Sequence, residues 1–301
     1  MTIHYNEEIK AKFLEELSSS DSQKTFLHLF KRAGTFEGLI GKDIFDFNST
    51  ECINLVVTLE PKSVNHVGVL KSQFNKYTEW AMSKGFTSTN FWGNVPINDD
   101  FAKLSFASRY VKNLEELTSM VESGLNALYD KYVPYLLFMG VMGESFEEIC
   151  SIKRDDTNSL LGIITTSRRQ YTKIIPPLLE LMQNDEYFQE HKPRDEDSIY
   201  FIKPFKNKSL AGKPIGYQYI SRVFSRLNDA HNNLNPDNQK NLTPMTCWRS
   251  GLFYALYQTE RSKGELINDD YLAVSEVYGN TLSYGHFSRE YELYKDVFWD
   301  N

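Results

Sequence analysis

Hydrophobic positions recur at helical spacing along the first part of the chain. The helical runs cover residues 9–17, 25–33, 49–59 and 63–85. In the last run, one apolar stripe extends from Val67 to Ala81, Ser63 is a candidate N-cap residue, and Gly85 is a candidate terminating glycine. This pattern predicts an all-helical N-terminal domain of residues 1–88.

The helical periodicity disappears between Phe86 and Phe106. Gly93, Pro96 and the run Asn98-Asp99-Asp100 fall in this stretch, and these residue types are typical of turns. We therefore predict a linker at residues 89–106 and a second domain at residues 107–301.

The second domain combines helical periodicity with two short apolar runs. Residues 160–166 and 172–175 favour β-strands, and the polar residues 167–170 between them favour a turn. Helical patterns cover residues 113–140 and 143–154 and resume near Pro177, Tyr217 and Pro244. The sequence predicts a mainly α fold with a small β-sheet, arranged in two domains.

Composition narrows the class of protein. Of the 301 residues, 41% are hydrophobic and 24% are charged, which is typical of a globular protein and excludes disorder and a membrane-embedded chain. No secretory signal is visible, so we expect a cytoplasmic location without membrane contact. The three cysteines are far apart, and neither a metal site nor a cofactor is expected. The net charge of −7 means that any nucleic-acid binding depends on a local basic face.

Two segments resemble motifs of the tyrosine recombinase (phage integrase) family. In residues 138–156, the spacing of Glu148, Ile152 and Asp156 is similar to a family segment in which Gly-Leu-Arg-x-x-Glu is followed by Leu and Asp. This alignment places Ser145 where the family has its first catalytic arginine. Residues 242–249 resemble the Thr-Pro-His-x-x-Arg box. There Arg249 matches the second arginine, and Thr246, or else Met245, stands at the histidine position.

The resemblance extends to the hairpin and to the C-terminal region. Arg168 lies where the family has a lysine-bearing hairpin. The last box has two possible registers, which place either Asn280 or His286 at the family's final histidine. Tyr291 and Tyr294 are the candidate nucleophiles, with packing as the alternative role for both.

The resemblance implies a helical core-binding (SAM-like) domain followed by an α+β integrase catalytic-like domain. In such a site, two arginines hold the scissile phosphate while a tyrosine attacks it. Ser145 has no guanidinium and Thr246 does not titrate near neutral pH, so the resemblance implies a degenerate catalytic set and no enzyme activity. The chain is similar to the recombinase-like lysogeny repressors of SPβ-type Bacillus prophages.

We therefore expect a sequence-specific regulator that binds double-stranded DNA, namely a phage or prophage transcriptional repressor associated with the host nucleoid. The alternatives are an active recombinase and a protein-interaction module that has lost DNA binding. Such a regulator can have a protein antagonist or inducer as a second partner. The candidate DNA-binding residues are Lys71, Lys76, Arg168, Arg169, Lys173, Lys206, Lys208, Arg222, Arg226 and Arg249.

Overall fold

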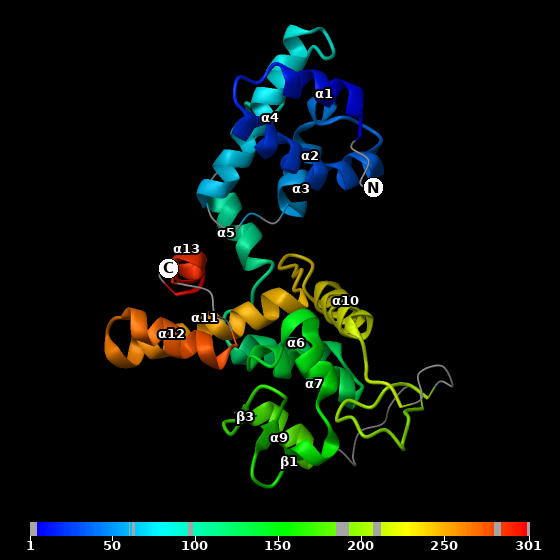
Figure 1. Ribbon diagram of the computed structural model, residues 1–301, viewed down its shortest axis with the longest axis vertical. Coiled ribbons are helices and arrows are strands. Elements are labelled where there is room, and N and C mark those ends of the chain that lie inside the picture. Colours follow the sequence, from blue (N-terminus) through cyan, green and yellow to red (C-terminus); the bar gives the residue numbers. More distant parts are fainter. Residues whose placement is uncertain are drawn as a thin grey trace. The chain divides into compact units, whose positions relative to one another are not determined.

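The computed structural model divides the chain into two compact units, Met1–Phe106 and Ala107–Asn301 (Figure 1). It describes residues 5–59, 61, 64–95, 99–184, 193–206, 212–279 and 284–299, without the side chains of Val64, Asp99, Tyr284, Gly285 and His286. The predicted N-cap Ser63 lies outside the described residues.

The N-terminal unit is helical, as predicted. Its elements are α1 (Glu7–Glu15), α2 (Ser20–Ile40), the 3-10 turn η1 (Ile44–Asp46), α3 (Ser49–Thr58), α4 (Val64–Ser83) and α5 (Asp99–Ala107). Helix α2 is longer than the predicted run because it has a cap at each end. Ser19 Oγ accepts the Ser22 N–H at 3.1 Å, and Gly41 ends the helix with a φ of 71°.

Helix α5 overlaps the C-terminal part of the stretch that the sequence predicted to be a linker. Ala102 and Phe106 are buried, while Leu104 between them is 71% exposed. These buried positions are four residues apart, as on one face of a helix. The apolar face is short, and turn-forming residues precede it. The sequence pattern therefore did not indicate a helix here.

The core of the N-terminal unit is rich in aromatic rings. The Phe13 ring lies 4.8 Å from Phe26 and 5.0 Å from Tyr77, both in edge-to-face geometry, and Trp80 lies 5.3 Å away. Edge-to-face pairs add to the free energy of apolar burial. These contacts hold α1 and α2 against α4.

A charged cluster is buried next to these rings, with Lys10 Nζ 5.3 Å from the centre of the Phe30 ring. Lys10 Nζ donates to Glu37 Oε1 at 2.6 Å and to the Tyr5 carbonyl at 2.6 Å, and it lies 3.7 Å from Asp43 Oδ2. Burial raises the pKa of Glu37 to about 7, although Lys10 opposes that shift, and burial also raises the pKa of Asp43. One lysine therefore joins α1, α2 and the residue that precedes η1.

The C-terminal unit is mainly helical around the buried helix α7. Its helices are α6 (Leu114–Gly124), α7 (Leu128–Phe138), η2 (Glu144–Phe146), α8 (Glu147–Ser151), η3 (Arg154–Asp156), α9 (Pro176–Gln183), α10 (Tyr217–Leu234), α11 (Pro244–Lys263), α12 (Asn268–Val277) and α13 (Tyr284–Phe298). Helix α11 approaches α7 closely, because a Cβ at Gly251 would lie 1.9 Å from the Phe138 carbonyl oxygen. In the described part of the chain, no helix has the length and apolar character needed to cross a membrane.

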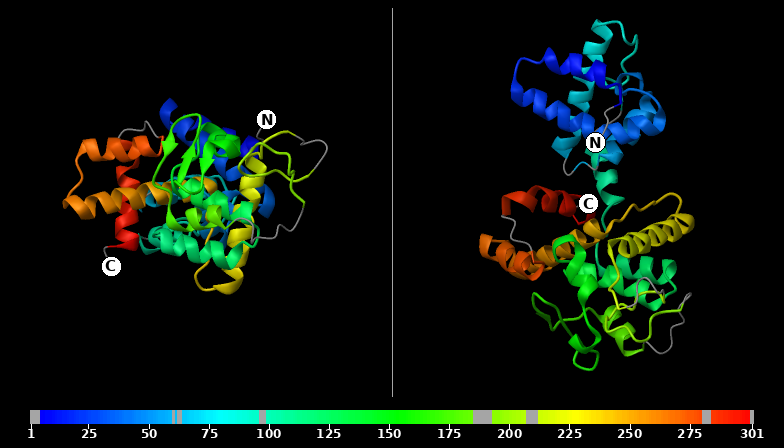
Figure 2. Two further views of the ribbon diagram at one scale, coloured as in Figure 1. Left: turned by 90° about the horizontal axis from the view of Figure 1, so that it is seen from below. Right: turned by 45° about the vertical axis from the view of Figure 1, so that its right-hand side comes forward.

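The predicted small sheet is present, with shorter strands than expected (Figure 2). Strands β1 (Thr157–Asn158), β2 (Ile163–Thr165) and β3 (Gln170–Tyr171) form an antiparallel sheet in that order, with Ile164 opposite both Thr157 and Tyr171. Leu160 and Leu161 lie in the exposed β1–β2 turn rather than in a strand. Residues 172–175 are not a strand either, since Pro176 begins α9.

Candidate nucleic-acid interface

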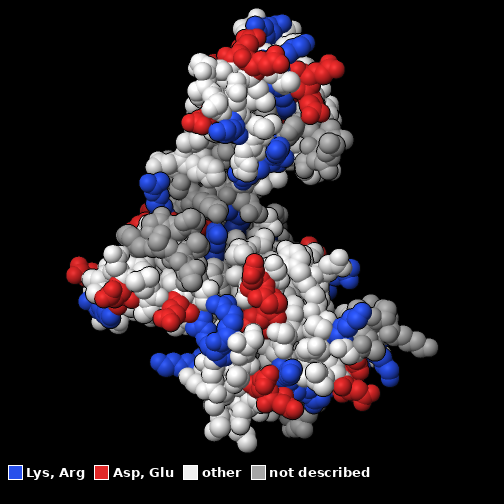
Figure 3. All heavy atoms as spheres, viewed as in Figure 1, with Lys and Arg blue, Asp and Glu red and all other residues white. Residues whose placement is uncertain are grey.

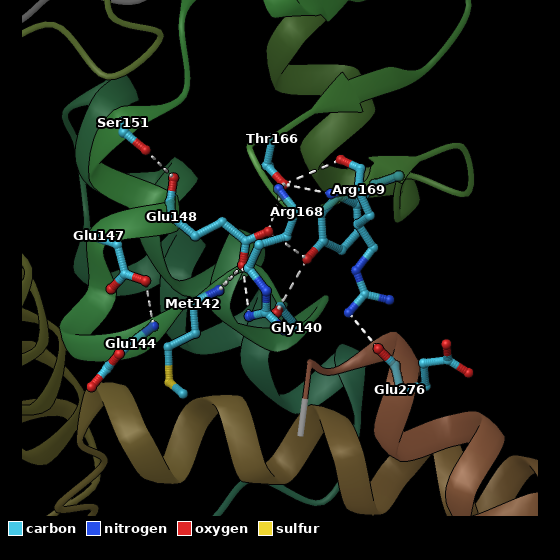
Figure 4. A network of polar contacts seen from close by, with 11 residues as sticks. Gly140, Met142, Glu144, Glu147, Glu148, Ser151, Thr166, Arg168, Arg169 and Glu276 are labelled. Carbon is cyan, nitrogen blue, oxygen red and sulfur yellow. Dashed lines mark hydrogen bonds and ion pairs between the residues drawn. The ribbon is translucent and has the colours of Figure 1, made fainter. Parts of the chain in front are cut away.

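A buried carboxylate, that of Glu148, organises the hairpin and the segment before α8 (Figure 4). Glu148 is 1% exposed. It accepts hydrogen bonds from Thr166 Oγ1 at 2.6 Å, from the Met142 N–H at 3.2 Å and from the Tyr171 hydroxyl at 3.2 Å. Arg168 Nη1 adds an ion pair at 3.4 Å. These donors compensate the buried charge and fix the β2–β3 turn against α8.

Two contacts define the orientation of the Arg168 side chain. Its guanidinium pairs with Glu148 and also lies against the backbone of Gly279, where a Cβ would be 1.8 Å from Nη2. Gly279 has a φ of 65°, a conformation that favours glycine, and a Cβ there would also require the Arg168 guanidinium to move. About a third of the Arg168 side chain, 35%, remains exposed. The hairpin turn therefore lies at the end of α12, beside Gly279. Gly279 directly precedes Asn280 in the sequence, which is one of the two candidates for the family's final histidine.

Arg169 and Lys173 continue the basic edge of the hairpin. Arg169 Nη2 donates to the Glu276 carbonyl at 2.6 Å, at the C-terminal end of α12, and its guanidinium lies 5.0 Å from the centre of the Tyr171 ring. The Lys173 side chain is exposed, and no polar contact ties it to the described residues. The hairpin therefore presents three cations, two of which are fixed in position.

Ser145, the predicted replacement of the first arginine, lies in a strained turn. It is exposed, with a φ of 52° and a ψ of 25°, and Phe146 also has a positive φ of 67°. Gly143 begins this turn with a φ of 73°, and a Cβ there would lie 2.7 Å from Glu148 Cβ. The Glu144 N–H donates to Glu147 Oε1 at 2.6 Å (Figure 4).

Arg249, the match to the second arginine, is already paired with an acidic residue. Its Nη1 donates to Glu290 Oε1 at 2.8 Å and to Oε2 at 3.1 Å, and the Tyr110 hydroxyl donates to the same carboxylate. Burial alone would lower the pKa of Arg249, but Glu290 raises it, so the guanidinium stays charged. A phosphate would have to compete with Glu290 for this half-buried cation.

Thr246, at the predicted histidine position, caps α11. Its N–H donates to Thr243 Oγ1 at 3.1 Å, and its own Oγ1 accepts the Thr243 N–H at 2.8 Å. This reciprocal capping box fixes the start of the helix. Thr246 is 5% exposed and Met245, the alternative histidine position, is 38% exposed.

Both candidate nucleophiles are buried. The Tyr291 hydroxyl donates to Glu260 Oε2 at 2.5 Å, and the Tyr294 hydroxyl donates to the Lys112 carbonyl. Burial raises the pKa of both tyrosines well above the usual range, and Glu260 raises that of Tyr291 further. Neither phenol is poised to become a phenolate. Asn280 and the side chain of His286 lie outside the part of the chain that the structure describes.

The remaining predicted DNA-binding residues occur in both units. In the N-terminal unit, Lys71 Nζ donates to the Val95 carbonyl at 2.9 Å, and the exposed Lys76 lies 5.8 Å from the centre of the Phe26 ring. Both lysines belong to α4, and their local contacts leave Lys76 the more accessible of the two.

In the C-terminal unit, only some of the predicted cations are open to solvent. Arg226 on α10 pairs with Asp130 Oδ2 at 2.6 Å although 47% of its side chain is exposed, and Arg222, one turn earlier, is exposed as well. Lys206 is exposed, and Lys208 lies outside the described residues. On the face of this unit that Figure 3 shows, basic and acidic side chains are interspersed. Binding to a polyanion would therefore depend on local groups such as the hairpin cations.

Sequence comparison relates the chain to prophage proteins. Residues 3–83 match the family model described as MrpR, N-terminal core-binding domain. The chain is also similar to the SPbeta prophage-derived uncharacterized protein YopR of Bacillus subtilis (strain 168). The two are 26% identical over 319 residues, which cover 97% of this chain and 96% of YopR.

Structure comparison finds recombinases at low similarity. XerA recombinase aligns with a TM-score of 0.40 and 13% identity over 97% of this chain and 98% of XerA. A lambda integrase(75-356) dimer bound to a COC' core site aligns with a TM-score of 0.39 and 12% identity, over 100% and 98%. Scores this low do not establish a shared fold by themselves. The family match and the full-length relative agree with the resemblance expected from the sequence: the chain is similar to a prophage protein over nearly its whole length, and residues 3–83 match the core-binding domain of MrpR.

Proposed function

We propose that the protein is a sequence-specific regulator that binds double-stranded DNA and acts as a prophage repressor without catalysing strand exchange. The observation that carries this proposal is the state of the two candidate nucleophiles. Tyr291 and Tyr294 are both fully buried, and both hydroxyls are engaged in hydrogen bonds. A site of this kind keeps cations that can hold phosphate but offers no phenolate to attack it.

The other positions of the motif support the same proposal. Removing one donor that stabilises transition-state charge lowers a rate by about 10²–10³, and Ser145 has neither the charge nor the fork of an arginine. Thr246 is engaged in capping α11, and Arg249 is paired with Glu290. These losses act on the same proposed chemistry, so they disfavour strand exchange more than any one of them alone.

DNA binding does not require a nucleophile. Contacts to phosphate need cations in fixed positions, and sequence is read separately by contacts to base edges. We propose that Arg168, Arg169 and Lys173 of the hairpin contact phosphate, together with Arg222 on α10. Arg168 is suited to this role, since Glu148 and Gly279 fix its direction while part of it faces solvent.

We expect the purified protein to shift fragments of prophage DNA in a gel without forming a covalent adduct on a nicked suicide substrate. Tyr291→Phe and Tyr294→Phe should leave this result unchanged. A covalent adduct that either variant abolishes would show an active recombinase instead. If no fragment is shifted, the result would favour the alternative that the protein is an interaction module without DNA binding.

We expect Lys173→Ala to weaken binding to all DNA sequences alike. The slope of log affinity against log salt should become shallower by roughly 0.9, the contribution of one phosphate contact. Arg249→Ala should change this slope less, because Glu290 already neutralises Arg249. The exposed Lys24 on α2 provides the control, and Lys24→Ala should leave the slope unchanged. An unchanged slope in folded Lys173→Ala would remove this lysine from the DNA surface.

A further inference from the structure

The C-terminal unit contains an apolar pocket that the proposed DNA contacts do not explain. Its volume is about 520 Å³, within the range of small-molecule sites. Phe138 at the end of α7, Tyr254 on α11 and Tyr278 after α12 contribute aromatic walls, and Ile175 adds an aliphatic one. These residues come from four segments that the α7–α11 contact and the hairpin bring together.

The charged residues that line this pocket have one sign. Arg169 and Lys173 both line it, and the described lining residues include no Asp or Glu. This is notable in a chain with a net charge of −7. Arg169 uses Nη2 for the Glu276 carbonyl, and a guanidinium has further N–H donors for a second acceptor. Lys173 is exposed and has three N–H donors to offer.

We propose that this pocket binds a small amphiphilic anion, with its apolar body against Phe138, Tyr254 and Tyr278 and its anionic group on Arg169 and Lys173. The apolar walls disfavour inorganic phosphate, which has no surface to bury there. The two cations disfavour a neutral or cationic ligand. An aromatic or aliphatic carboxylate or sulfonate satisfies both the walls and the charges.

A consequence for regulation follows, and this part rests on the proposed function. Arg169 and Lys173 are among the proposed phosphate contacts, so an anion held in the pocket competes with DNA for the same two cations. The ligand would then act as an inducer that weakens DNA binding. This coupling needs no movement of one unit relative to the other.

The pocket can be tested on the full chain with 8-anilinonaphthalene-1-sulfonate, a probe with an aromatic body and one sulfonate. We expect saturable binding with one probe per chain, measured by fluorescence titration. Lys173→Glu should raise the dissociation constant by on the order of tenfold or more. Ala255→Trp should abolish binding, because Ala255 lines the pocket and a tryptophan fills it.

Matched controls separate the pocket from non-specific binding. Ser262→Trp places the same ring on an exposed position of α11, and Lys24→Glu makes the same charge change on α2, so both should bind the probe like the parent chain. Since this probe also binds partly unfolded protein, each variant must keep its thermal unfolding transition. Non-saturable binding would overturn the proposal, as would a folded Lys173→Glu that binds the probe unchanged.

The coupling has a separate test. In a gel shift, saturating probe should weaken DNA binding of the parent chain, while Ala255→Trp should bind DNA normally and resist the probe. Probe binding without any effect on DNA affinity would overturn the coupling. Saturable probe binding by a chain that shifts no DNA would overturn the proposed function and leave the pocket standing. A chain that binds DNA but not the probe would overturn the pocket proposal and leave the proposed function standing.

Discussion

Lys10→Met should lower the free energy of unfolding of the N-terminal unit by about 3–5 kcal/mol, because it leaves Glu37 and Asp43 buried without their cation. Methionine is an unbranched side chain that lacks only the terminal atom of lysine, so lost packing contributes little. Urea unfolding, combined with hydrogen exchange of the α2 amides, measures the effect. Lys12→Met is the matched control, since Lys12 is exposed on the same helix. Equal losses in the two variants would contradict the role of Lys10.

The same cluster predicts the direction of a pH effect. The pKa of Glu37 is about 7 in the folded chain, above the ordinary value of 4.5, so folding favours its protonated form. The stability that this group contributes is complete below pH 4.5 and is lost as the pH rises through about 7. Lys10→Met removes the charge that opposes this shift. Its destabilisation should therefore be larger at pH 8 than at pH 5.5, and an equal loss at both values would exclude charge as the cause.

Gly251→Ala should be the most damaging small substitution in the C-terminal unit. The added methyl would lie 1.9 Å from the Phe138 carbonyl oxygen, which is backbone and cannot turn aside, so α11 must move away from α7. Overpacking of this kind lowers the free energy of unfolding by about 1–3 kcal/mol, and occasionally by more. We expect the upper end of that range, or about 6–12 °C in the midpoint of thermal unfolding for a unit of this size.

A helical glycine with open space around it supplies the control. Gly68 in α4 is exposed and has no atom within 4 Å of an added Cβ, so Gly68→Ala should stabilise the chain by about 0.4–1 kcal/mol. If Gly251→Ala is as stable as Gly68→Ala, α7 and α11 do not approach as closely as the structure shows.

Much of the fold could be predicted from local patterns. The four N-terminal helices and the hairpin follow from apolar periodicity, β-branched residues and capping signals, all of which act over a few residues. Strand β1 has only the two residues Thr157 and Asn158, and α5 has a short apolar face. Such elements form because tertiary contacts select them, and a periodicity argument needs longer runs.

The candidate site was less predictable than the fold. The position of Arg168 at the hairpin turn follows from strand and turn signals. The pairing of Arg249 with Glu290 could not be predicted in this way. The two residues are 41 positions apart in the sequence and meet only when α13 packs beside α11. The sequence indicated Glu148 only as part of a motif. Its burial and its contacts with four donor groups depend on the folded hairpin. The charges were visible in the sequence, but their partners were not.

The cap at the start of α11 bears on whether catalysis could be regained from this chain. A histidine at position 246 would supply a titratable group but would remove the reciprocal bonds with Thr243, and losing a side-chain cap typically destabilises a protein by about 1 kcal/mol. If the protein is inactive, as we propose, a lineage starting here would lose stability at that first step, while Ser145 and the buried Tyr291 and Tyr294 would still disfavour strand exchange. On the proposed function, the Thr246 hydroxyl that secures the helix therefore opposes the return of a histidine by a single substitution.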